Sequence, residues 1–267
     1  MPDRSVAKLP AGAARTAVYR AVWNILYLLQ GGIMRIVGLQ KMTLLDYPGK
    51  VACTVFLGGC NFRCPFCHNG GLLDDQAPAV MTREALMKIL EGRQGLLDGV
   101  CITGGEPTLS PELPQLLAKI KALGFDVKLD TNGSRPQVLK QVVEAGLVDY
   151  VAMDVKNCPD RYAATVGLSL APIEALEESL LFLMKSGVDY ELRTTVVREF
   201  HDAAAIGAMG QWLYGLNGCQ KIPKLFLQPF VQRASVPDQA LTAPETTETP
   251  HFAELLQPFV QVVAVRG

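Results

Sequence analysis

Strand-like runs alternate with amphipathic runs along most of the chain, and this order constrains the fold more than any other feature. Runs rich in aliphatic and β-branched residues predict strands at residues 51–57, 99–103, 126–130, 150–154, 190–197 and 223–228. Apolar residues three or four positions apart predict helices at residues 83–91, 111–123, 136–145, 172–186 and 202–214. Strands separated by helices form parallel sheets, so we expect an α/β protein with a partial (β/α)6 TIM-like barrel.

The two ends of the chain depart from this pattern. Residues 260–265 resemble an edge strand, and residues 237–250, rich in Thr, Pro and Glu, resemble a surface loop. The first 33 residues carry an apolar stretch of about 12 residues, short of the ~20 needed to span a bilayer. We expect one catalytic domain over residues 34–267 and no membrane span. Residues 1–33 form either a peripheral helix or a non-native extension, because a strand pattern begins at Met34.

Charge and cysteine usage narrow the setting in which the protein works. The formal net charge of −1 offers no broad basic surface for nucleic acid. Seven cysteines are an odd count, and no cleavable secretory signal precedes them, which argues against a disulfide framework. We therefore expect a protein of the reducing cytoplasm.

A loop directly after the first predicted strand carries Cys60, Cys64 and Cys67 in the spacing C-x3-C-x2-C. Iron–sulfur clusters are ordinarily held by four thiolates, so three cysteines leave one iron open to a small-molecule ligand. The alternative is a zinc site with His68 as the fourth ligand. That alternative is weaker, because His68 is adjacent to Cys67 and closed zinc sites usually separate their ligands by two or more residues.

Further polar and glycine residues follow the ends of the next strands, and in a barrel this end of the strands builds the active site. Two glycines let a ligand approach the backbone, Glu106 can accept from an ammonium group, and Asp130 can accept from a ribose diol. Asp154 and Arg193 lie on strand faces where they can pair with each other or with a ligand. Tight turns and a salt-bridged surface are the simpler explanations. The candidate binding residues are Phe66, Gly104, Gly105, Glu106, Asp130, Asn132, Asp154, Lys156 and Arg193.

The cysteine loop, the Gly-Gly-Glu after the next strand and the Asp-Thr-Asn-Gly after the third resemble the radical S-adenosylmethionine (SAM) superfamily. The resemblance runs from about Met34 to about Val231. Cys-His-Asn after the loop, the Asp-Val-Lys of the fourth strand and Asp-Tyr-Pro-Gly at residues 46–49 are similar to glycyl-radical-enzyme activases. Residues 38–50 most resemble the anaerobic ribonucleoside-triphosphate reductase activating proteins.

This resemblance implies a mechanism and a set of partners. The three cysteines would bind a 4Fe-4S cluster whose open iron SAM chelates, with no separate acid or base. Residues 104–106 would hold the methionine ammonium, Asp130 the ribose, and Asp154 and Lys156 the methionine carboxylate; Phe66 would contact the adenine or shield the cluster. Reductive cleavage of SAM would give a 5′-deoxyadenosyl radical that removes hydrogen from a glycine of a partner enzyme. A flavodoxin- or ferredoxin-like donor would supply the electron.

Two other functions stay open from the sequence alone. The same SAM chemistry could act on a small molecule, such as a pterin- or nucleotide-like ring, or the chain could be a non-catalytic iron–sulfur or zinc module. One departure from the activases bears on this choice. Formate-lyase activases place a His after the last barrel strand, whereas this chain has Pro229, Phe230 and Val231 there.

Overall fold

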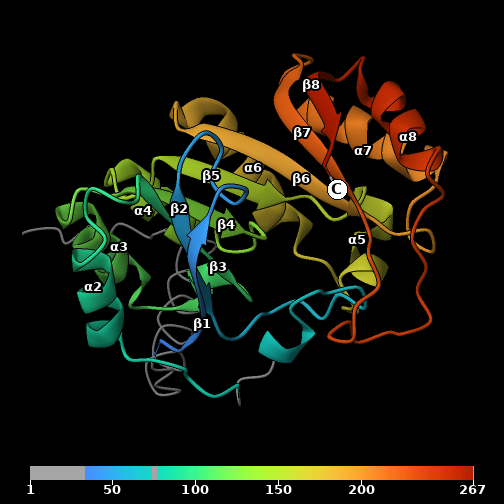
Figure 1. Ribbon diagram of the computed structural model, residues 1–267. Coiled ribbons are helices and arrows are strands. Elements are labelled where there is room, and N and C mark those ends of the chain that lie inside the picture. The colour runs from blue at the N-terminus through green and yellow to red at the C-terminus, as the bar shows by residue number, and fades with distance from the viewer. Residues whose placement is uncertain (1–33, 74–76, 267) are drawn as a thin grey trace, which may run out of the picture. The chain divides into compact units, whose positions relative to one another are not determined.

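The computed structural model describes residues 34–73 and 77–266, and it contains an eight-stranded sheet with the strands in sequence order (Figure 1). The neighbours from β2 to β8 are parallel, whereas β1 is antiparallel to β2. The predicted α/β partial barrel is therefore confirmed, with six βα-type strands and one added strand at each edge. The strands are β1 (Ile36–Thr43), β2 (Ala52–Leu57), β3 (Gly99–Gly104), β4 (Asp126–Thr131), β5 (Tyr150–Asp154), β6 (Asp189–Val196), β7 (Ile222–Pro229) and β8 (Val260–Val265).

The helices follow the strands as the alternating pattern predicts, with two additions that the sequence analysis missed. Helix α5 has seven residues, too few to show a periodic pattern, and α8 begins inside the segment that was expected to be a loop. The interpretation of residues 1–33 falls outside the described residues. The helices are α2 (Arg83–Glu91), α3 (Leu113–Ala122), α4 (Pro136–Glu144), α5 (Pro159–Thr165), α6 (Ile173–Ser186), α7 (Ala203–Leu216) and α8 (Glu248–Leu256); η1 (Gly70–Leu72) and η2 (Pro107–Leu109) are 3-10 turns.

Local sequence signals fix several helix ends. The Thr82 hydroxyl accepts from the Ala85 N–H at the start of α2, and the Asp202 carboxylate accepts from the Ala205 N–H at the start of α7. Both are N-cap residues that satisfy a backbone donor without a partner inside the helix. Helix α6 ends at Gly187, which has φ 76°, a left-handed conformation that glycine adopts without a Cβ penalty. These caps set where each chain segment turns back toward the sheet.

Alternate residues of the parallel strands face two different environments. On β4, Val127 and Leu129 are fully buried in the hydrophobic core, whereas Lys128 and Asp130 share the opposite face. The opposite face of the neighbouring strands is polar as well, with Asp154 on β5 and Arg193 on β6. The barrel interior is therefore a charged lumen that opens at the carboxyl ends of the strands. Within the described residues, no helix is long and apolar enough to cross a membrane.

Candidate active site

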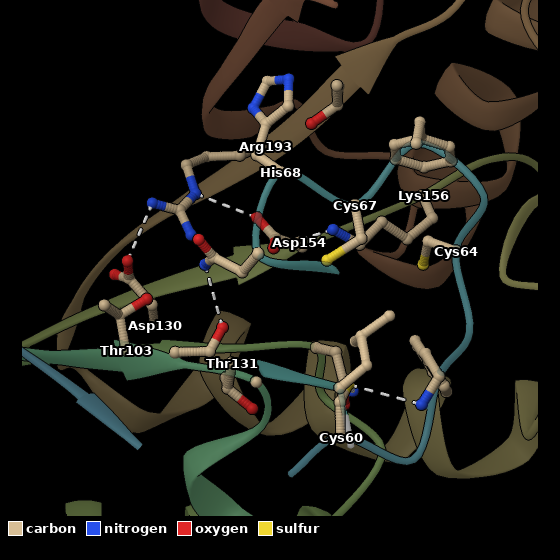
Figure 2. A pocket seen from close by; sticks show the side chains of 18 of the residues that line it. Cys60, Cys64, Cys67, His68, Thr103, Asp130, Thr131, Asp154, Lys156 and Arg193 are labelled. Atoms are coloured by element: carbon tan, nitrogen blue, oxygen red, sulfur yellow. Dashed lines mark hydrogen bonds and ion pairs between the residues drawn. The ribbon is translucent and has the colours of Figure 1, made fainter. Parts of the chain in front are cut away.

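A pocket at the carboxyl ends of β3 to β7 gathers residues from segments far apart in the sequence (Figure 2). It draws one wall from the loop after β2 and the opposite wall from the strand ends. Nearly all of the candidate residues from the sequence lie there. The lining residues are Cys60, Phe62, Cys64, Phe66, Cys67, His68, Asn69, Leu73, Thr103, Gly104, Gly105, Asp130, Thr131, Asn132, Asp154, Lys156, Arg193, Thr195 and Gln228.

Three thiols of the loop after β2, at Cys60, Cys64 and Cys67, face this one pocket. All three are free, as are the four other cysteines of the chain. Burial raises the pKa of Cys60 to about 12 and that of Cys64 to about 11, and it also raises the pKa of Cys67. Binding of a metal group to these thiols must therefore release protons. Among the described residues, no three His, Cys, Asp or Glu side chains converge on a single-ion site.

The loop that carries the thiols (residues 58–73, hereafter the cysteine loop) is tied to its surroundings by backbone and amide contacts. The Gly59 N–H donates to the Leu72 carbonyl at 2.9 Å and so joins the two ends of the loop, whereas the Arg63 N–H donates to the Val166 carbonyl outside the loop at 2.9 Å. The Asn132 amide donates to Asn61 Oδ1 at 3.0 Å and lies 3.9 Å from Cys60 Sγ. Asn132 thus links the end of β4 to the loop, besides lining the pocket.

Gly104 and Gly105 permit a close approach of two backbones. A Cβ at Gly104 would lie 2.2 Å from the Leu57 carbonyl oxygen, and one at Gly105 would lie 2.0 Å from the Gly59 carbonyl oxygen. The approach is held by hydrogen bonds from the Gly105 N–H to Leu57 and from the Glu106 N–H to Gly59, each 2.8 Å. The close approach that the two glycines were expected to give a ligand is made here by the end of β2 at Gly104 and by the cysteine loop at Gly105.

Glu106 occupies a different place from the one expected. The side chain is 2% exposed and is absent from the pocket lining in the described part of the chain. Its carboxylate accepts from the Thr108 N–H, the Thr108 hydroxyl, the Thr131 hydroxyl and the Asn132 N–H. Three of these donors reach Oε1 and the Asn132 N–H reaches Oε2, so Glu106 braces the turn after β3 against the end of β4.

The wall opposite the cysteine loop carries an ion-pair network. Arg193 Nε donates to Asp154 Oδ1 at 3.0 Å, and its NH1 donates to Asp130 Oδ2 at 3.2 Å. Lys156 Nζ donates to the second oxygen of Asp154 at 2.9 Å. Burial alone would raise the pKa of Asp154, but Arg193 and Lys156 outweigh it and hold the pKa at about 2. The pairing of Arg193 with Asp154, one of the two options from the sequence, is the one found.

Aromatic residues and a histidine complete the pocket. Phe66 is 3% exposed and packs against Phe200 at 5.8 Å between ring centroids, and Lys156 Nζ lies 6.0 Å from its ring centre. His68 stacks on Phe230 at 5.6 Å, and its Nε2 lies 2.8 Å from the Val231 carbonyl oxygen. Because no group of three or more His, Cys, Asp or Glu side chains among the described residues is arranged to hold a single metal ion, the tetrahedral zinc alternative is disfavoured.

Sequence reasoning missed several lining residues. Asn69 donates to the Gly104 carbonyl oxygen at 3.2 Å, and Thr103 and Gln228 lie at the ends of β3 and β7. The alternation of residues along a strand could have indicated Thr103, because residues two positions apart, such as Cys101 and Thr103, lie on the same face. Asn69 belongs to the Cys-His-Asn sequence that resembles the activases, but no contact of its side chain was predicted from the sequence.

The Asp-Tyr-Pro-Gly segment lies at the other end of the barrel. Tyr47 is 2% exposed and packs against Tyr150 with 6.0 Å between ring centroids, and a Cβ at Gly99 would touch its ring at 3.0 Å. Gly99 and Tyr150 are the first residues of β3 and β5. Asp46 accepts from the Thr54 hydroxyl at 2.6 Å. This segment closes the amino ends of the strands and does not reach the pocket.

Comparison with known proteins shows the family of the chain. A family model described as the radical SAM superfamily matches residues 54–206. The chain belongs to the radical SAM superfamily. Members of this superfamily use a 4Fe-4S cluster and SAM, and these are the cofactors of this protein. The crystal structure of Streptococcus suis SuiB bound to S-adenosylmethionine shares the fold, with a TM-score of 0.62 and 12% identity over 78% of this chain and 48% of that one.

Relatives of this radical SAM protein differ in the reactions that their names describe. A Methanocaldococcus jannaschii protein provisionally named a glycyl-radical enzyme activating enzyme is 35% identical over 62% of this chain and 69% of its own length. The pyruvate formate-lyase-activating enzyme of Clostridium pasteurianum is 33% identical over 47% of this chain and 54% of its own. A Thermococcus kodakarensis protein provisionally named a GTP 3′,8-cyclase is 31% identical over 54% of this chain and 46% of its own. The chain thus spans about half the length of the second and third of these.

Proposed function

We propose that this radical SAM enzyme generates a glycyl radical on a partner enzyme, such as an anaerobic ribonucleotide reductase. The observation that carries the proposal is that three free thiols and a charged wall face each other across one pocket (Figure 2). The likeness to the M. jannaschii and C. pasteurianum proteins supports an activase over other reactions. We place this chemistry in an anaerobic cytoplasm, with a flavodoxin- or ferredoxin-like protein as the electron donor.

The donor set of the pocket fits the two cofactors. Thiolates are the soft ligands that iron–sulfur clusters require, and Cys60, Cys64 and Cys67 would hold three irons. Charged groups on the opposite wall suit the amino and carboxylate ends of an amino acid. A reduced cluster held here would supply one electron for the cleavage of SAM to methionine and a 5′-deoxyadenosyl radical, which would take one hydrogen atom from the partner's glycine and leave as 5′-deoxyadenosine.

We assign a task to residues of the charged wall and to other residues around the pocket. Lys156, fixed by Asp154, would bind the methionine carboxylate. Asp130 keeps a free lone pair on each oxygen besides its bonds to cations, so it can still accept from a ribose hydroxyl. Gly104 and Gly105 would offer backbone to the methionine ammonium, while Asn132 would keep Cys60 in place. Phe66, buried beside Cys64 and Cys67, would exclude water.

Electron paramagnetic resonance on a mixture with the partner tests this proposal. Anaerobically reconstituted protein, given reductant, SAM and a glycyl radical enzyme encoded beside it, is expected to produce the doublet of a glycyl radical. Cys64→Ala should abolish that signal and reduce the bound iron. The matched control is Cys219→Ala, which removes an exposed thiol that is absent from the pocket lining in the described residues. An iron-loaded protein that cleaves SAM but gives no glycyl radical on any such enzyme contradicts the activase assignment.

A small-molecule substrate is the second candidate, and the likeness to the T. kodakarensis cyclase supports it. In that case the pocket would admit a nucleotide-like ring above Asp154 and Lys156, and turnover would need no protein partner. Incubating the reduced, SAM-loaded enzyme with GTP and following loss of GTP by chromatography separates the two. Consumption of GTP in step with formation of 5′-deoxyadenosine would favour the cyclase-like reaction.

A further inference from the structure

Lys128 is a buried lysine that the site described so far does not use. It lies on β4 with 1% of its surface exposed, two residues before Asp130 and on the same face of the strand. Its ammonium pairs with Asp130 Oδ1 and lies 3.8 Å from Cys101 Sγ. Lysines are almost never fully buried unless they are paired, because burying a charge is costly. Its placement inside the barrel therefore calls for a reason beyond packing.

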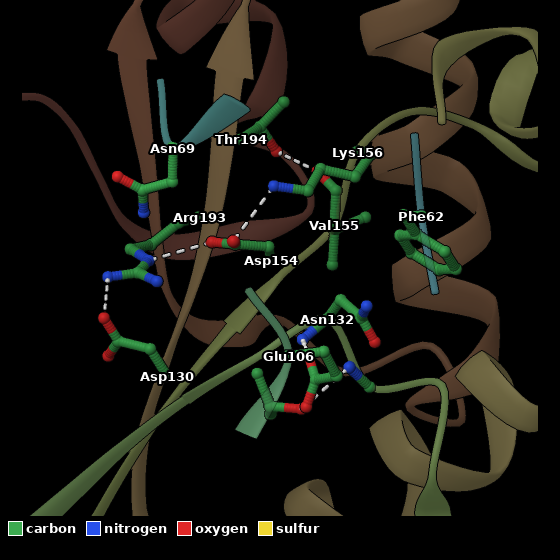
Figure 3. A network of polar contacts seen from close by, with 12 residues as sticks. Phe62, Asn69, Glu106, Asp130, Asn132, Asp154, Val155, Lys156, Arg193 and Thr194 are labelled. Carbon is green, nitrogen blue, oxygen red and sulfur yellow. Dashed lines mark hydrogen bonds and ion pairs between the residues drawn. The ribbon is translucent and has the colours of Figure 1, made fainter. Parts of the chain in front are cut away.

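Lys128 is the inner end of a row of five alternating charges that leads to the pocket. The row continues through Asp130, Arg193 and Asp154 to Lys156, and Figure 3 shows its last four members. Three positive and two negative groups give it a formal charge of +1. Each inner member of the row contacts two neighbours, so a change at one end alters the pairing along it.

The middle of the row explains how Lys128 acts at a distance. Arg193 is divided between two carboxylates, with Nε on Asp154 at 3.0 Å and NH1 on Asp130 at 3.2 Å. Lys128 binds Oδ1 of Asp130 and Arg193 binds Oδ2, so the two cations share the charge of one carboxylate. Without the lysine, the whole charge of Asp130 would act on Arg193, and a bidentate pair with Asp130 would draw it away from Asp154.

The outer end of the row is held at the pocket. Asp154 Oδ2 binds Lys156 Nζ at 2.9 Å. The Lys156 backbone is fixed on both sides, since its N–H donates to the Tyr162 hydroxyl at 3.2 Å and its carbonyl oxygen lies 2.8 Å from His201 Nε2. Movement of Asp154 would therefore release the Lys156 ammonium but not its backbone. The position of that ammonium depends on the row of charges beneath it.

We propose that Lys128 is a positioning residue for the carboxylate end of SAM, although it does not line the pocket within the described residues. It neutralises Asp130, which keeps Arg193 on Asp154 and thereby aims Lys156 at the ligand. The inference rests on the proposed binding of SAM in this pocket. This role differs from a purely structural one, because loss of the charge at residue 128 should weaken the binding of SAM in protein that still folds and still binds iron.

The test is the dissociation constant of SAM, measured by isothermal titration calorimetry on anaerobically reconstituted protein. Lys128→Met keeps the approximate length of the side chain and removes the charge, and it should weaken SAM binding about tenfold with an unchanged iron content. KM for SAM should rise by a similar factor, while kcat changes less than threefold. The matched control is Lys140→Met, which removes a lysine paired with Glu178 on the helical surface at 2.7 Å and should leave SAM binding unchanged.

A second variant covers the case in which Lys128→Met does not fold. Lys128→Gln can still donate to Asp130 but carries no charge, and it should weaken SAM binding at least fivefold. Wild-type affinity in a folded, iron-loaded Lys128→Met or Lys128→Gln protein overturns the inference and leaves Lys128 a structural residue. Failure of the iron-loaded wild-type protein to bind SAM would instead overturn the proposed function.

Discussion

At the scale of single residues, Asp154 keeps a low pKa although burial acts to raise it. Its pKa is lowered from 3.8 to about 2 because Arg193 and Lys156 favour the charged form. A pKa that is depressed in the folded state stabilises the fold above the unfolded pKa, and this stabilisation is lost as the pH falls through the folded pKa. The difference corresponds to about 2 kcal/mol at neutral pH, and roughly half of it is lost by pH 3.

We therefore predict that acid destabilises the wild-type protein more steeply than an Asp154→Asn variant. The free energy of unfolding, measured with urea between pH 5 and pH 3, should fall by about 1 kcal/mol less in the variant. Asp189→Asn, a change at an exposed carboxylate, should follow the wild-type slope. If the free energy of unfolding fell equally with pH in Asp154→Asn and the wild type, Arg193 and Lys156 would not be lowering the pKa of Asp154.

The strand period predicted which side of each strand faces the site, but not what each side chain contacts. It placed Asp130, Asp154 and Arg193 at one rim, and all three line the pocket. Glu106 was expected at the ligand, and it braces two loops because four donors surround its carboxylate. Lys128 went unnoticed, since a lysine in an apolar strand signals nothing until its buried partner is known. Contacts of this kind depend on tertiary packing that a single sequence does not show.

At the scale of elements, the turn between β1 and β2 has a structural task. Tyr47 is buried against Tyr150 and beneath Gly99 at the amino ends of the strands, far from the strand ends that build the pocket. In barrels the amino-end face serves stability, whereas the carboxyl-end face carries the chemistry. The residues of this turn that resemble activases therefore close the barrel and do not contact the SAM pocket.

Removing the Tyr47 ring should separate stability from ligand binding. Tyr47→Ala is expected to lower the free energy of unfolding by about 3–5 kcal/mol, the range for loss of a buried aromatic ring. The folded fraction should bind SAM with wild-type affinity in calorimetry. Leu45→Ala in the same turn serves as the control, because Leu45 is 89% exposed and should change stability little. A large loss of SAM affinity in folded Tyr47→Ala would contradict this division of tasks.

The helices and strands were predicted best where the periodic pattern of apolar residues was clear. Within residues 34–266, every predicted strand and helix is present, with ends displaced by at most two residues, as for the helix expected at 111–123 and found at Leu113–Ala122. A strand was expected to begin at Met34, but its antiparallel pairing with β2 was not predicted. Helix α8 was missed because Thr, Pro and Glu around its start resemble a loop, although its apolar residues Phe252 and Leu256 are buried.

At the scale of the whole molecule, the site depends on a long-range contact that the sequence did not indicate. The segment after β7 (residues 230–238, hereafter the strap) returns to the cysteine loop, which precedes it by more than 150 residues (Figure 1). The Ser235 hydroxyl donates to the His68 carbonyl oxygen at 2.7 Å, and the Asp238 N–H donates to the Pro65 carbonyl oxygen at 3.0 Å. His68 stacks on Phe230 in the same region.

The strap begins just after the last barrel strand, where formate-lyase activases place a histidine and this chain has none. Phe230 and Val231 stand there, and the histidine that meets them is His68 of the cysteine loop. The strap therefore contributes to the site by holding the loop that carries the thiols. No local pattern predicts such a contact, because it joins two irregular segments far apart in the sequence, and each of its hydrogen bonds has a backbone group on at least one side.

Gly70 is where the strap and the cysteine loop meet most closely, and substitution there should part them. A Cβ at this residue would lie 2.2 Å from the Ser235 carbonyl oxygen and 3.0 Å from Pro237, so Gly70→Ala cannot be accommodated without a backbone shift. Amide hydrogen exchange, followed by mass spectrometry, should accelerate at least tenfold in residues 58–73 and 230–238. Local opening of this kind raises exchange in the parted segments alone and leaves strand amides protected.

Gly71→Ala provides the matched control, since a Cβ at Gly71 meets nothing within 4 Å and should leave exchange as in the wild type. The two variants differ by one position and add the same methyl group, so helix propensity and composition cannot account for a difference between them. Faster exchange in Gly70→Ala together with reduced iron after reconstitution would show that the strap stabilises the loop in its ligand-binding conformation. Unchanged exchange in both segments would mean that the contact at Ser235 carries no stability, and that the cysteine loop is held by its other contacts.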